Sequence, residues 1–164
     1  MKEIEQTINS AMEFDITPVM ERYAEETRLP PEVLEEHQRE IKRFLALCAV
    51  SPGKYAMRGP LDELWHTFIL FTSLYANFCR RLGGGFIHHL PESPRKATEQ
   101  RDRTNNSYLQ FLTDYERVFK EQPPFDIWPR PLGGDLRDPS CDQCGNYCAQ
   151  TCVAIDLMPP EKRF

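Results

Sequence analysis

Four proline sites divide this chain into segments, and each combines a proline with a residue that can begin a helix or turn the chain. They are Thr17-Pro18, Pro30-Pro31, Gly59-Pro60 and Ser93-Pro94. Proline suits the first helical position because its φ angle matches a helix and the N–H that it lacks would be unpaired there. Between these sites apolar residues recur at steps of three and four, which is the period of a helix with a buried face. The sequence therefore predicts an all-α fold.

The expected helices are four to five in number. We place them at about residues 18–29, from 31 onward, at 60–82 and at 94–120, with a short helix before them around Ile8. The helix over 60–82 has the richest apolar stripe, so we expect it to be the central one and to end at the glycines from Gly83. No segment shows the alternation of a strand.

The domain plan follows from a change of composition after residue 124. There Phe125, Ile127 and Trp128 stand among prolines and glycines, which predicts an extended segment held on the helices by its aromatic residues. We expect one helical domain at residues 1–124 and an irregular tail, rich in proline, glycine and cysteine, at residues 125–164.

Charge and hydropathy limit the partners of the chain. Its 164 residues, 40% of them hydrophobic, are enough for one domain with its own core. The formal net charge of −5 disfavours nucleic acid and anionic lipid as partners. The sequence has no stretch like a signal peptide and no run long enough to span a bilayer. We therefore expect a cytoplasmic protein that does not associate with membranes.

The middle of the chain carries a cluster of aspartate and histidine residues. Asp62 and His66 are four residues apart and therefore share one face of the expected helix. His88 and His89 follow the glycine turn, which allows the chain to fold back beside that helix. Imidazole and carboxylate groups bind zinc, iron, manganese or copper, so we predict a metal site here. The alternatives are a structural hydrogen-bond network and metal-free acid–base catalysis.

The tail carries four closely spaced cysteines, a pattern that favours metal binding in a reducing compartment. They are Cys141, Cys144, Cys148 and Cys152. The first pair has the spacing of a zinc site, four thiolates also suit an iron–sulfur cluster, and a helical segment would align the sulfurs for copper(I). We expect zinc, with an iron–sulfur cluster or copper(I) as alternatives, against disulfides or a thiol pair that would only staple the tail.

Three further residues of these types are assigned to other roles. Cys48 and Cys79 lie on apolar helix faces, where a free cysteine behaves as a small hydrophobic residue of the core. His37 stands between charged and polar neighbours and is expected to face solvent.

The residues from 60 to 91 resemble a known family. The run from Leu61 to Leu70, followed by Tyr75, Cys79, the glycines and the segment from Ile87 to Pro91, is similar to bacterial relatives of the glycine-rich domain-containing proteins. The resemblance implies that the family's aspartate and first histidine correspond to Asp62 and His66, its cysteine to Cys79 and its late histidine to His88 or His89. It implies relationship rather than a reaction.

These observations support two alternative functions. The first is a small metal-binding protein with a central His/Asp site and a cysteine centre, serving as an accessory or redox component. The second is a helical protein-interaction module with a structural His/Asp network and a zinc-stapled docking tail. Both imply another protein as partner, and the first also admits a small-molecule substrate. Nucleic-acid binding through Arg80, Arg81 and the stretch from Arg95 to Arg103 is disfavoured by the net charge.

Overall fold

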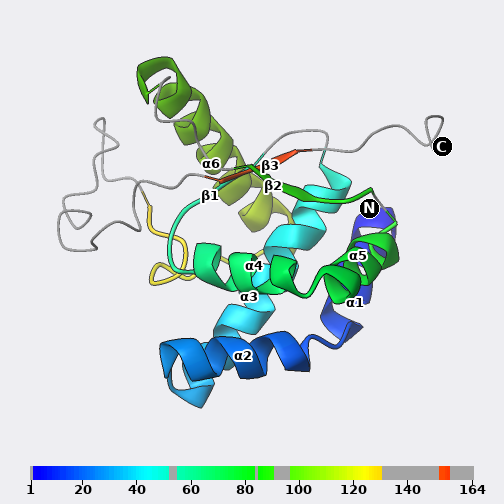
Figure 1. Cartoon of the computed structure of the whole chain (residues 1–164). Coiled ribbons are helices and arrows are strands. Elements are labelled where there is room, and N and C mark those ends of the chain that lie inside the picture. The colour runs from blue at the N-terminus through cyan, green and yellow to red at the C-terminus, as the bar shows by residue number, and fades with distance from the viewer. Residues whose placement is uncertain (1, 52–54, 84, 91–96, 131–151, 156–164) are drawn as a thin grey trace.

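The fold is mainly all-α, as predicted. The computed structural model describes residues 2–51, 55–83, 85–90, 97–130 and 152–155 (Figure 1). Its elements are α1 (Lys2–Glu13), α2 (Thr17–Thr27), α3 (Pro31–Val50), β1 (Ala56–Met57), α4 (Leu61–Leu70), α5 (Thr72–Arg81), β2 (His88–Leu90), α6 (Ala97–Phe119) and β3 (Cys152–Ile155). Within these ranges, no helix combines the length and the apolar character needed to cross a membrane.

Helix α3 lies at the centre of the molecule, with α1, α2 and α4 packed against it. Figure 1 shows α3 running behind α4, with α2 below and with α1 and α5 side by side at one end. Phe44 of α3 is fully buried and contacts Trp65 of α4 and Phe111 of α6 through its ring edges. The prediction that the segment 60–82 forms the central helix is therefore wrong, because that segment lies on one side of α3.

The segment 60–82 also forms two helices instead of one. The backbone leaves the helix at Phe71, with φ −81° and ψ 60°, and α5 starts at the next residue. The N–H of Phe71 bonds the carbonyl of Phe68, and the N–H of Tyr75 bonds the carbonyl of Phe71. Neither glycine nor proline stands at this break, so the sequence carries no local signal for it. The consequence is that α5 turns back towards the face of α4.

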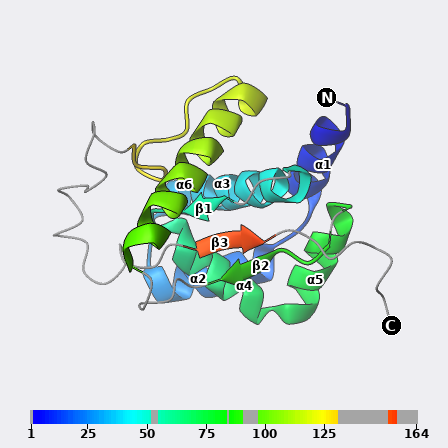
Figure 2. The ribbon, with the colours of Figure 1, turned by 90° about the horizontal axis from the view of Figure 1, so that it is seen from above.

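A three-stranded sheet covers one side of α4, with the strands in the order β1-β3-β2. Both pairs are antiparallel, and the register places His89 opposite Ala154 and Ala56 opposite Val153. Figure 2 shows β3 between the other two strands. These strands have two to four residues, which is too short for the alternation that identifies a strand in a sequence. The sequence therefore gave no indication of this sheet.

The segment after α6 packs on the helices through one of its two predicted aromatic anchors, Trp128, and through Ile127. Ile127 and Trp128 are buried, whereas Phe125 is 61% exposed. The backbone carbonyl of Ile127 leaves no room for a side chain at Gly59, since a Cβ there would lie 2.2 Å from the carbonyl oxygen. Gly59 also has a φ of +95°, which favours glycine. This close approach fixes the turn that leads into α4.

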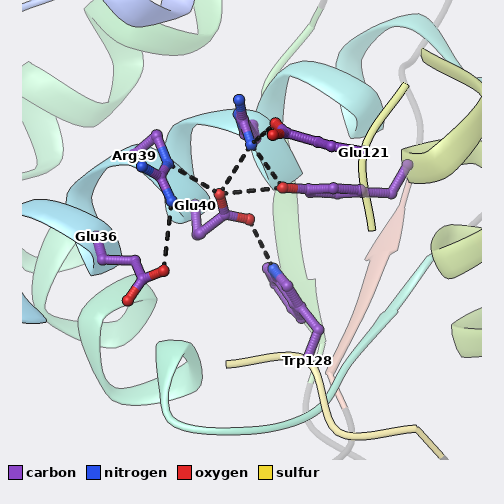
Figure 3. Close-up of polar contacts among 7 residues, drawn as sticks. Glu36, Arg39, Glu40, Glu121 and Trp128 are labelled. Carbon is purple, nitrogen blue, oxygen red and sulfur yellow. Dashed lines mark hydrogen bonds and ion pairs between the residues drawn. The ribbon is translucent and has the colours of Figure 1, made fainter. Parts of the chain in front are cut away.

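A fully buried carboxylate on α3 also holds this segment in place (Figure 3). The indole N–H of Trp128 donates to Oε2 of Glu40 over 2.8 Å, and the hydroxyl of Tyr115 donates to Oε1 over 3.1 Å. Arg39 and Arg43 donate to the same Oε1 at 3.2 and 3.1 Å. Glu40 thus joins three parts of the chain that are far apart in the sequence.

His37 is buried, so the prediction that it faces solvent is wrong. Its Nδ1 shares a hydrogen bond of 3.0 Å with the hydroxyl of Tyr23 on α2. Burial lowers the pKa of His37, while the nearby charge of Glu36 acts in the opposite direction. Cys48 and Cys79, by contrast, are buried as predicted.

The buried His37 predicts a loss of stability in acid. Its pKa is lower in the folded chain than in the unfolded chain, so protons bind preferentially to the unfolded state. The stabilisation is complete above the ordinary histidine pKa of about 6.5 and is lost as the pH falls below it. Urea unfolding between pH 7.5 and 5 should show a smaller loss of stability for His37→Gln than for the native chain. Equal losses in the two proteins would contradict the prediction.

Candidate metal centre

The candidate site lies between the first two turns of α4 and strand β2. Asp62 stands in the first turn of α4, where the unpaired backbone N–H groups of the helix favour a negative charge. His66 follows one turn later on the same face, as the sequence predicted. Strand β2 runs along this face and brings His89 to both residues. Three side chains from two separate segments therefore meet.

The distances among these side chains are short. Nε2 of His89 lies 3.0 Å from Oδ1 of Asp62, and Nδ1 of His66 lies 3.4 Å from Oδ2. The two imidazole rings have centroids 4.2 Å apart at an angle of 51°. Taking one donor atom from each residue, all three atoms lie within 4.8 Å of one another. An ionised Asp62 can only accept, so in the metal-free site Nε2–H of His89 donates to it.

One side of the cluster is closed and the other is open. The side chain of His89 is 5% exposed and that of Asp62 is 16% exposed, whereas His66 is 48% exposed. The ring of Trp65 packs against His89 with centroids 4.5 Å apart, and Trp65 itself is fully buried. Any ion bound among these residues would be enclosed on the side of His89 and Asp62 and would be accessible to solvent beside His66.

Not all predicted ligands meet at this place. His88 is exposed and its ring lies 4.9 Å from that of Phe86, outside the group formed by Asp62, His66 and His89. Successive residues of a strand point to opposite faces, so β2 can direct only one of its two histidines to α4. The sequence alone left His88 and His89 equivalent.

The four-cysteine cluster falls almost wholly outside the described residues. Cys141, Cys144 and Cys148 are not among them, and for Cys152 only the backbone is described. That backbone lies in β3 opposite Met57, and two residues later Ala154 is paired with His89. The end of the cysteine run is thus joined to the strand that carries His89.

Sequence reasoning assigned Trp65, Tyr75 and Cys79 to a single apolar stripe and missed their contacts around this site. The indole N–H of Trp65 donates to the hydroxyl of Tyr75 over 2.9 Å, and this hydroxyl donates to the backbone carbonyl of Ile87 over 2.6 Å. The only signal in the sequence is that a tryptophan and a tyrosine, both able to form hydrogen bonds, occupy otherwise apolar positions.

The chain belongs to the UCP032817-like family, which it matches over residues 8–124. The match includes Asp62, His66 and His89. It overturns the expected relationship to the glycine-rich domain-containing proteins, because the family shown over residues 60–91 is a different one. A few spaced residues, most of which serve packing in this fold, were not enough to identify the family. Searches among curated proteins and among solved structures give no match.

Proposed function

We propose that this protein binds a divalent transition-metal ion, with zinc favoured, through Asp62, His66 and His89. The observation that carries the proposal is the convergence of one carboxylate and two imidazoles, with donor atoms within 4.8 Å of one another. Ligands of a tetrahedral zinc ion lie about 3.4 Å apart, given bond lengths of about 2.1 Å. Because His66 is 48% exposed, its ring has room to turn towards an ion and close the remaining gap.

The proposed site leaves part of the coordination sphere open. Two histidines and one carboxylate supply three ligands, so water or a substrate would occupy the remaining positions beside the exposed His66. The ion would take the place of the hydrogen atom on Nε2 of His89, which would then carry its proton on Nδ1. Only unprotonated imidazole nitrogens bind a metal, so binding would weaken in acid. An accessory role is consistent with such an open zinc site, whereas a redox role would require iron or copper in its place. The partner expected is another protein.

The four cysteines are proposed as a second centre. Their spacing suits zinc, an iron–sulfur cluster or copper(I). The competing function is a helical interaction module in which the tail alone holds zinc. The hydrogen bond between His89 and Asp62 favours this alternative, because it satisfies Asp62 in part without any ion.

Metal analysis of protein purified without oxygen tests these functions. We expect the native chain to bind zinc or cobalt(II), His66→Ala to lose the ion of the central site, and Cys144→Ser to lose only a separate equivalent. His88→Ala is the matched control, since it removes an exposed histidine next to His89. Metal that is lost in Cys144→Ser but fully retained in His66→Ala would support the interaction module. A native chain that binds no metal under reducing conditions would refute the metal function.

A further inference from the structure

The backbone of Ile87, two residues before His89, is held by a side chain of helix α5. Its carbonyl accepts a hydrogen bond of 2.6 Å from the hydroxyl of Tyr75. The thiol of Cys79 lies near both groups: burial raises its pKa, while the backbone of Ile87 and the hydroxyl of Tyr75 act in the opposite direction. Tyr75 is fully buried, Cys79 is 2% exposed and Ile87 is 4% exposed. The segment that leads into β2 is therefore tied to α5 away from solvent.

The same tyrosine is tied to α4. Its hydroxyl accepts a hydrogen bond from the indole N–H of Trp65 over 2.9 Å, and the Trp65 ring also contacts the ring of His89, with centroids 4.5 Å apart. Trp65 is the neighbour of His66 in the sequence. Trp65 therefore contacts His89 directly and is also connected to it through Tyr75 and the backbone of Ile87.

We propose that Tyr75 is a positioning residue that fixes the backbone at Ile87, and through it the ring of His89, for metal binding by the central site. This inference rests on the proposed metal function. The break at Phe71 makes the arrangement possible, because in one straight helix residues 65 and 75 would be about 15 Å apart along the axis. Without the hydrogen bond to Ile87, the ring of His89 would be oriented by the short strand pairing, by the packing of Trp65 and by its own contacts with Asp62 and His66.

The expected effect is a weaker and distorted metal site in a chain that still folds. Groups that orient metal ligands without touching the ion change metal affinity by about 10–100-fold when they are removed. Tyr75 acts through the backbone, so we expect the lower end of this range, about tenfold. Tyr75→Phe removes only one oxygen atom and keeps the packed ring, which lies edge-on to Phe68 and Phe86.

Cobalt(II) titration followed by visible absorption tests the inference, because the spectrum reports the geometry of the ligands as well as affinity. We expect Tyr75→Phe to raise the Kd for cobalt about tenfold and to change the spectrum of the bound ion. Tyr108→Phe is the matched control, since it removes a buried hydroxyl that donates to the carbonyl of Pro129 instead. The titrations are made with Cys144→Ser in the background, so that the tail does not contribute.

A measurement without metal separates this inference from the proposed function. Nuclear Overhauser contacts between the rings of Trp65 and His89 should be present in the native chain and in Tyr108→Phe, and weaker in Tyr75→Phe. If the native chain binds no cobalt, the metal function is refuted. The ring contacts alone then test whether Tyr75 positions His89. Native affinity, an unchanged cobalt spectrum and unchanged ring contacts in Tyr75→Phe would overturn the inference.

Discussion

Glu40→Ala should lower the free energy of unfolding by about 3–5 kcal/mol, the range for breaking a buried ion pair by removing one partner. The side chain of Glu40 is fully buried and accepts hydrogen bonds from Arg43, Tyr115 and Trp128. Its removal leaves the indole N–H of Trp128 buried without its acceptor. Arg43 keeps contacts with Tyr115 and Glu121, so it is not left wholly unpaired.

Urea unfolding monitored by circular dichroism measures this loss. Glu36→Ala is the control, because Glu36 is 40% exposed and pairs only at the surface with Arg39, so its removal should change the stability by less than about 1 kcal/mol. Glu40→Gln keeps acceptor and volume and should fall between the two. A loss below about 1 kcal/mol for Glu40→Ala would show that the network adds little to the stability. The fluorescence of Trp128 would then also remain unchanged.

Asp62→Asn should weaken metal binding by about 100-fold or more, since it removes a charged ligand directly and not an outer group. The asparagine oxygen can still accept the hydrogen bond that Nε2–H of His89 donates to Oδ1 of Asp62. The metal-free protein should therefore keep its stability within about 1 kcal/mol. This substitution separates the metal site from a structural network, which an alanine would disrupt as well.

Calorimetric titration with zinc, together with urea unfolding of the metal-free chain, checks both parts. In a metal site the affinity falls and the intrinsic stability is kept. A purely structural network predicts the opposite result. The native centre would then bind no zinc, and Asp62→Asn would change only the stability. His88→Ala should match the native chain in both measurements, because this residue lies outside the cluster.

The prediction for Glu40 concerns the stability of the fold, and the prediction for Asp62 concerns the metal site. Glu40 fixes the segment after α6 to the central helix, and Trp128, which it holds, stacks on Phe44. Phe44 in turn contacts Trp65, the residue that packs against His89. We expect the loss of Glu40 to affect metal binding far less than stability, because Phe44 retains its own burial and its contact with Phe111.

The sequence by itself determined the helix starts near Pro18 and Pro31, the buried faces of the helices and the proximity of Asp62 to His66. Each of these follows from the geometry of one helix, in which residues four apart always share a face. Tertiary structure decided the rest. The break at Phe71 has no local signal, the choice between His88 and His89 depends on how β2 meets α4, and the bond from Trp128 to Glu40 spans 88 positions. Such contacts arise from the packing of whole elements, which the spacing within a single segment does not specify.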